Sequence, residues 1–120
     1  MYADQFEVRV ARVRHRFAAT LENKIETAMV SADRMSRNDG SVIQYVSESY
    51  RRLHSICGVG AMVGFAATGE AAHAAEAALI QAYLEKRGLT ETESLGLKRA
   101  LARLRDVAAS ELRLMYQRGG

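Results

Sequence analysis

The sequence contains no proline and no tryptophan, and it has one cysteine among its 120 residues. A single cysteine cannot form a disulfide within the chain, and such sparse use of cysteine is typical of the reducing cytoplasm. The longest apolar runs are only a few residues long, whereas a helix needs about 20 apolar residues to cross a bilayer. The first residues also lack the charged-then-apolar layout of a secretory signal. We therefore expect a cytoplasmic protein with no membrane partner.

The composition favours helices over strands. Apolar residues make up 48% of the chain and charged residues 26%, which is the balance of an ordinary soluble domain. Without proline no helix is forced to stop, and the abundant Ala, Leu, Glu and Arg all have high helix propensity. We find no internal repeat and no low-complexity linker. Residues 1–120 are therefore predicted to form a single all-α domain.

Capping and turn residues divide the chain into four predicted helices. A capping box pairs a polar side chain with Glu or Gln three residues later. The pairs of this kind that precede apolar periodic segments are Asp4 with Glu7, Ser41 with Gln44, and Thr90 with Glu93. The turn-forming residues 37–40, Gly64 and Gly88 mark the expected ends of the first three helices.

Each predicted helix carries one apolar face, because apolar residues recur every three or four positions. The first helix shows Phe6, Val10, Val13, Phe17, Leu21, Ile25 and Met29; the second Val42, Val46, Ser49, Leu53, Ile56, Gly60 and Val63; the third Ala71, Ala75, Ala78, Leu79 and Ala82; the fourth Leu97, Leu101, Leu104, Ala108, Leu112 and Met115. Short connections and one apolar face per helix predict an antiparallel four-helix bundle.

His54 lies off the apolar face of the second helix, by roughly 110° at 100° per residue. Its imidazole should therefore sit at the edge of that helix and point outward. The residues that follow it on the same side, Gly58 and Ala61, have almost no side chain. A glycine in the middle of a helix costs about 1 kcal/mol relative to alanine. We interpret this cost as room left beside His54 for an incoming partner.

The third helix offers partners for this histidine. If the second and third helices pack antiparallel about Gly64, Glu76 and His73 lie roughly level with His54. Glu76 could then accept a hydrogen bond from the ring Nδ1–H, which leaves Nε2 free as a nucleophile near neutral pH. Arg51, one turn before His54, could stabilise an attached anionic group electrostatically.

The spacing around His54 resembles that of the histidine phosphotransfer (HPt) domains. These domains have a histidine, an aliphatic residue two positions on and glycines four and ten positions on, here His54, Ile56, Gly58 and Gly64. The alanine-rich segment 69–76 is also similar to that family. The resemblance implies that His54 accepts a phosphoryl group from a receiver-domain aspartate and passes it to another receiver. Arg51 and His73 would then lie near the phosphoryl oxygens.

The resemblance also implies the partners. They would be receiver domains of response regulators or hybrid histidine kinases, which supply the Mg²⁺, so that the chain needs no cofactor and has no kinase or hydrolase activity of its own. We expect a monomer that docks its partner through Ser47, Ser55, Gly58, Ala61 and Phe65.

Cys57 departs from the family pattern. Family members often have lysine or arginine three residues after the histidine, where a positive charge steadies the phosphoryl group. Arg51 or His73 could replace that charge. The alternative is a fold of this kind that docks a receiver without accepting phosphate.

A metal site is not expected. Glu70 and His73 form a Glu-x-x-His pair, but carboxylate-bridged di-iron bundles need two such pairs and further inward glutamates. No second pair occurs, because arginines precede His15 and His54 by three residues.

A basic cluster in the first helix leaves another function open. Its members are Arg9, Arg12, Arg14, His15 and Arg16. The cluster is either a solvated helix face or a docking surface for an acidic protein or nucleic acid. No aromatic residues are interleaved with these arginines, as a single-strand binder would require. We therefore rank an interaction or nucleic-acid-binding module below phosphotransfer.

Overall fold

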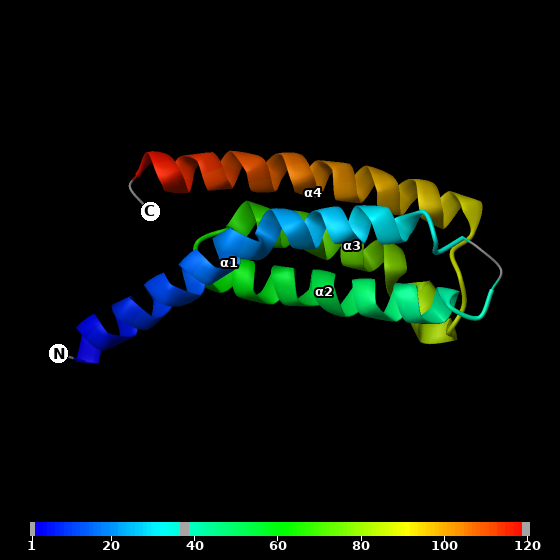
Figure 1. Ribbon diagram of the computed structural model, residues 1–120, viewed down its shortest axis with the longest axis horizontal. Helices are drawn as coiled ribbons and strands as arrows, with labels where there is room; N and C mark the ends of the chain where they lie inside the picture. Colours follow the sequence, from blue (N-terminus) through cyan, green and yellow to red (C-terminus); the bar gives the residue numbers. More distant parts are fainter. Residues whose placement is uncertain (1, 37–38, 119–120) are drawn as a thin grey trace.

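Four α-helices account for nearly all of residues 2–36 and 39–118, which are the parts of the chain that the computed structural model describes. They are α1 (Tyr2–Ala32), α2 (Val42–Met62), α3 (Ala66–Glu85) and α4 (Glu91–Gln117). Each helix runs antiparallel to the one before it, in an elongated molecule (Figure 1) of 54 × 26 × 18 Å. The predicted all-α class is confirmed. Within the described ranges, no helix is both long and apolar enough to cross a bilayer.

The helices pack as a ring, since α1 and α3 each contact both α2 and α4. The core lies along the centre of this ring. All the residues predicted for the apolar faces of α2 and α4 are buried, with Leu53, Ile56, Leu101 and Leu104 almost completely so. On α3 the prediction also holds, except that Ala78 is only half-buried. Periodicity therefore identified the core faces of these three helices correctly.

Small residues let α2 and α3 approach closely. A Cβ added to Gly69 would lie 3.1 Å from the carbonyl oxygen of Cys57 and 3.3 Å from the backbone nitrogen of Ala61. Ala72 and Ala75, further along α3, are completely buried. The two backbones thus meet without intervening side chains, and residues on the adjoining edges of α2 and α3 are brought together.

The predicted apolar face of α1 is wrong in its first part. Phe6 is 68% exposed, Val13 is also exposed and Val10 is only half-buried. The amino-terminal part of α1 extends beyond the other helices (Figure 1), so it has no neighbour to cover it. Burial begins at Phe17 and continues through Leu21. Periodicity predicted a helix correctly, but it carries no information about how far the neighbouring helices reach.

The helix starts agree with the prediction at one position and differ at another. Thr90 and Glu93 form the expected capping box: the Glu93 N–H donates to Thr90 Oγ1 over 3.1 Å, and the Thr90 N–H donates to Glu93 Oε1 over 2.8 Å. The Ser41 box is absent, because the Ser41 hydroxyl bonds to Asp39 and the Gln44 amide to Glu48. Helix α1 already begins at Tyr2, and the side chain of the expected cap, Asp4, lies outside the described residues.

Two helix ends also needed correction. Helix α1 ends at Ala32, before the expected residues 37–40, of which 37 and 38 lie outside the described residues. Helix α3 ends in a left-handed residue at Lys86 (φ 54°), and not at Gly88. The Arg87 N–H reaches back to the Ala82 carbonyl over 3.1 Å, which is the bond of a Schellman motif. That bond closes the helix two residues before the glycine. Gly64, with φ 91°, does form the predicted break between α2 and α3.

An ion pair strengthens the start of α4. The Arg87 guanidinium donates to both carboxylate oxygens of Glu93, over 2.7 and 3.1 Å. These bonds, together with the one from the Thr90 backbone, lower the pKa of Glu93 to about 2. A carboxyl that ionises more readily in the folded than in the unfolded chain stabilises the fold above its unfolded pKa, and this contribution disappears as the pH falls toward the folded pKa.

We predict that Glu93→Gln lowers the free energy of unfolding at pH 7 by about 1 to 2 kcal/mol, because it breaks a bidentate ion pair and a cap. The difference from wild type should shrink as the pH falls from about 4.5 toward 2, where wild-type Glu93 itself becomes protonated. Urea unfolding at pH 7 and pH 3 measures both quantities. The exposed Glu91→Gln is the matched control. An equal deficit at both pH values would contradict the pKa assigned to Glu93.

Candidate functional site

His54 lies in the middle of α2, at the edge of its buried face. The imidazole is 70% exposed, although its neighbour Leu53 is completely buried and Ile56 nearly so. This is the position that helical periodicity predicts. The ring is therefore accessible to a partner while the helix that carries it is anchored in the core.

A buried carboxylate holds one nitrogen of this ring. Nδ1 of His54 lies 2.9 Å from Oε1 of Glu76 on α3, whose side chain is only 9% exposed. A carboxylate can only accept, so Nδ1 carries the proton and the lone pair of the neutral ring is on Nε2. The structure thus brings together the two residues that the sequence placed level with each other, with the nucleophilic nitrogen directed away from Glu76.

Tyr50 is a site residue that the sequence analysis missed. Its ring stacks on His54, with the centroids 6.1 Å apart and an interplanar angle of 12°, and it also stacks on Tyr83 of α3, with the centroids 4.2 Å apart. Burial, then the negative charge of Glu76 and an interaction of the phenol with that carboxylate, raise the pKa of Tyr50, so the phenol stays protonated. The sequence spacing could have predicted this contact, because Tyr50 precedes His54 by one helical turn and so lies on the same side of α2. The stack restricts the orientation of the imidazole.

Arg51 does not point to His54 in this structure. One of its terminal nitrogens donates to Ser47 Oγ over 2.7 Å, and Nε lies 3.4 Å from the Ser47 carbonyl oxygen. Both bonds direct the guanidinium toward the start of α2. Arg51 is exposed, so a rotation of its side chain is needed before it can reach an anion on His54.

His73 and Cys57 lie on the other side of the Glu76 carboxylate. Nδ1 of His73 is 4.0 Å from Glu76 Oε2, whereas His54 is bonded to Oε1. Ligand atoms of Cys57, His73 and Glu76 all lie within 4.8 Å of one another. Burial, and then the charge of Glu76, raise the pKa of Cys57, so its thiol is protonated at neutral pH. The Glu76 carboxylate therefore contacts His54 through Oε1 and lies close to His73 and Cys57 as well.

Most of the residues predicted for docking are accessible. Ser55, Gly58 and Ala61 are exposed, and Ser47 is half-buried under Arg51. Nothing lies within 4 Å of a Cβ added at Gly58. The surface beyond His54 toward the end of α2 is therefore open and bears very small side chains.

Phe65 is not part of that surface. It is 2% exposed and packs edge to face on Phe17, with the ring centroids 5.2 Å apart. The prediction was wrong because Phe65 follows the turn at Gly64, which directs its ring into the core. Met62 is 66% exposed near the end of α2, so it presents a large apolar side chain where Phe65 was expected to do so.

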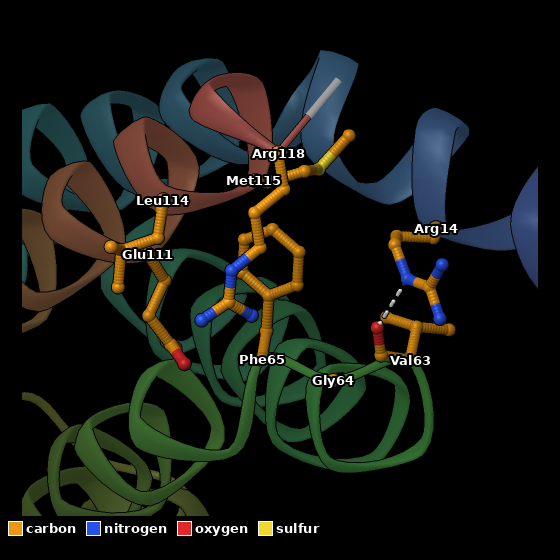
Figure 2. A pocket seen from close by; sticks show the side chains of 8 residues that line it. All are labelled: Arg14, Val63, Gly64, Phe65, Glu111, Leu114, Met115 and Arg118. Carbon is orange, nitrogen blue, oxygen red and sulfur yellow. Dashed lines mark hydrogen bonds between the residues drawn. The ribbon is translucent and has the colours of Figure 1, made fainter. Parts of the chain in front are cut away.

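The basic cluster of α1 divides into two parts. Arg9, Arg12, His15 and Arg16 are exposed, whereas Arg14 is half-buried. Nε of Arg14 donates to the Val63 carbonyl over 2.8 Å, across the turn between α2 and α3 (Figure 2). Arg14 therefore anchors α1 to the end of α2.

A cavity of about 400 Å³ adjoins this turn (Figure 2). It is lined by Arg14, Val63, Gly64, Phe65, Glu111, Leu114, Met115 and Arg118. Glu111 already accepts from the Thr68 backbone N–H over 2.6 Å, as Arg14 already donates to Val63. The turn is about 15 Å along α2 from His54, at 1.5 Å per residue. The cavity is thus separate from the His54 site.

We predict opposite effects for alanine at two glycines near His54. Gly58→Ala should raise the free energy of unfolding by about 0.5 to 1 kcal/mol, because the new methyl group meets open space and alanine is the better helix former. Gly69→Ala should lower it by about 1 to 3 kcal/mol, because its methyl group would press on the backbone of α2. Urea midpoints measure both changes. A Gly69→Ala variant that is as stable as wild type, or more stable, would show that α2 and α3 are not in close backbone contact at Gly69.

Comparisons of the chain with protein-family models, with curated proteins and with solved structures found no significant match. The assignment of a function therefore depends on the geometry around His54. Its features are an exposed imidazole, a buried carboxylate bonded to Nδ1 and an open surface beyond the ring.

Proposed function

We propose that this protein is a histidine phosphotransfer protein, in which His54 carries a phosphoryl group between receiver domains. The observation that supports this proposal most is the bond between Nδ1 of the exposed His54 and the buried Glu76 carboxylate. It leaves Nε2 unprotonated and directed away from the bundle. A nucleophile that must enter another protein's active site needs this combination of accessibility and fixed orientation.

The reaction uses few groups of this chain. The lone pair on Nε2 of His54 attacks the phosphorus of a receiver aspartyl phosphate, the phosphorus–oxygen bond to the aspartate breaks, and the aspartate leaves as a carboxylate. The Nδ1 proton stays between His54 and Glu76, whose negative charge stabilises the positive charge that develops on the ring. The reverse sequence on a second receiver completes the transfer. Mg²⁺ belongs to the receiver's acidic site.

The surface around His54 suits such a partner. Gly58 and Ala61 leave room for the receiver's active-site loops, and the exposed Met62 adds an apolar contact at the edge. Arg51 is close enough along the helix to turn from Ser47 toward the phosphoryl oxygens once they are present. In this proposal the protein acts as a cytoplasmic monomer without a cofactor of its own.

We expect incubation with a phosphorylated receiver domain to add one acid-labile phosphoryl group to the wild-type protein. His54→Gln should abolish this adduct with no loss of helicity, whereas His15→Gln, which changes an exposed histidine on α1, should leave it intact. Intact-mass spectrometry before and after acid treatment measures the adduct, and circular dichroism measures the helicity.

A folded protein that takes up no phosphoryl group from any receiver tried would refute the proposal. Receiver binding without an adduct would then identify a docking module. Steeply salt-dependent nucleic-acid binding that survives His54→Gln would instead favour the exposed arginines of α1.

We further expect Glu76→Gln to slow phosphoryl transfer to His54 by about 100-fold, because the neutral amide neither fixes the Nδ1–H tautomer nor stabilises a positive ring. Glu70→Gln, an exposed change on the same helix, is the matched control and should transfer at the wild-type rate. Rapid-quench kinetics with the same phosphorylated receiver measure both rates. A wild-type rate for a folded Glu76→Gln variant would remove Glu76 from the mechanism.

A further inference from the structure

Cys57, His73 and Glu76 form a cluster whose ligand atoms lie within 4.8 Å of one another. Cys57 comes from α2, and the other two are one turn apart on α3. The proposed transfer uses only one side of this cluster, the Glu76 Oε1 that holds His54. The thiol of Cys57, the imidazole of His73 and the second carboxylate oxygen are not needed for it.

The second oxygen of Glu76 is the strongest sign of a missing ligand. Glu76 is more than nine-tenths buried, and its Oε2 has no hydrogen-bond partner among the described residues. This oxygen faces His73, whose Nδ1 is 4.0 Å away. A buried, unpaired carboxylate oxygen is costly, whereas a bound cation would satisfy it.

We propose that Cys57, His73 and Glu76 Oε2 bind a zinc ion. A tetrahedral zinc ion holds sulfur at about 2.3 Å and nitrogen or oxygen at about 2.0 to 2.2 Å, so its ligands lie about 3.5 Å apart. The exposed His73 side chain can close the remaining gap by rotation. Three protein ligands leave a fourth position for water.

The donor set selects the metal. A thiolate and an imidazole favour zinc over magnesium or calcium, which prefer oxygen ligands. Cys57 is a thiol in the free protein, so the ion replaces its proton: the sulfur–hydrogen bond breaks, a zinc–sulfur bond forms and one proton is released to solvent for each ion bound. Zinc affinity should therefore rise with pH.

Helix packing creates this site. Glu-x-x-His pairs along the sequence indicate only carboxylate-bridged di-iron sites. They do not place Cys57 of α2 beside His73 of α3. In the structure the close approach at Gly69, next to the Cys57 carbonyl, supplies that neighbour.

If His54 carries phosphate as proposed above, zinc would regulate the transfer. Oε1 of Glu76 accepts the hydrogen bond from His54, while Oε2 would bind the ion. The imidazole and the ion would therefore compete for the electrons of one carboxylate. Zinc weakens the acceptor bonded to Nδ1–H, and Nε2 becomes a poorer nucleophile. Zinc should therefore slow phosphoryl uptake.

The direct test is a titration of the reduced full-length protein with Co²⁺, followed by displacement with Zn²⁺. We expect one equivalent of Co²⁺ to bind with a thiolate-to-cobalt charge-transfer band, and zinc to remove that band. Cys57→Ser should abolish the band, and His73→Gln and Glu76→Gln should each weaken binding by more than about 10-fold. His15→Gln should bind as wild type does, and circular dichroism should show that every variant is folded.

A folded wild-type protein without the charge-transfer band at millimolar Co²⁺, or a band that survives Cys57→Ser, would overturn the site. No receiver is present in this titration, so its result is independent of the proposed phosphotransfer.

The regulatory step has its own test. Phosphoryl uptake should slow when one equivalent of Zn²⁺ is added to wild type but not to Cys57→Ser, which also corrects for any effect of zinc on the receiver. An equal rate with and without zinc, in a wild-type protein that binds the ion, would overturn the regulation while leaving the site in place.

Discussion

The contact between the α2 and α3 backbones is the constraint on which the rest of the site depends. At Gly69 there is no room for a side chain against the Cys57 carbonyl, and the buried alanines of α3 continue the close approach. At this separation a glutamate on α3 can reach a histidine on α2 directly. Larger residues at the interface would push the two helices apart and lengthen that hydrogen bond.

This geometry gives the two oxygens of Glu76 different environments. Oε1 bonds to an exposed ring, whereas Oε2 is buried 4.0 Å from Nδ1 of His73 and has no hydrogen-bond partner among the described residues. A buried carboxylate needs hydrogen-bond partners, and His54 supplies one for Oε1 only. The influence of Glu76 extends further, because its charge contributes to the raised pKa values of Tyr50 and Cys57. One buried carboxylate thus lies close to both the aromatic and the sulfur groups around His54.

The incorrect predictions arise where the surroundings of a residue override its local sequence pattern. Phe6 has the correct spacing for a core face, but it lies in the amino-terminal part of α1, which extends beyond the other helices, and its side chain is exposed. Phe65 is directed inward by the turn at Gly64, and Ser41 prefers a bond to Asp39 over the predicted capping box. In each case the spacing of the residues matched the predicted pattern. Whether the side chain became buried or formed a cap was decided by surroundings that the spacing does not contain.

The sequence by itself determined the helical class, the buried faces of α2 and α4, the break at Gly64 and the position of His54 at a helix edge, because these follow from propensity and a periodicity of 3.6 residues per turn. It also placed Glu76 level with His54 once an antiparallel turn was assumed. Only the tertiary structure decided that the two side chains are 2.9 Å apart, that Arg51 is directed to Ser47, that Tyr50 stacks on the imidazole and that Cys57 meets His73. The contacts of His54 with Glu76 and of Cys57 with His73 join α2 to α3, so they depend on the distance and rotation between the helices, which no single helix's sequence encodes. The contacts of Arg51 and Tyr50 lie within α2 and depend on the side-chain rotamers that the folded structure selects.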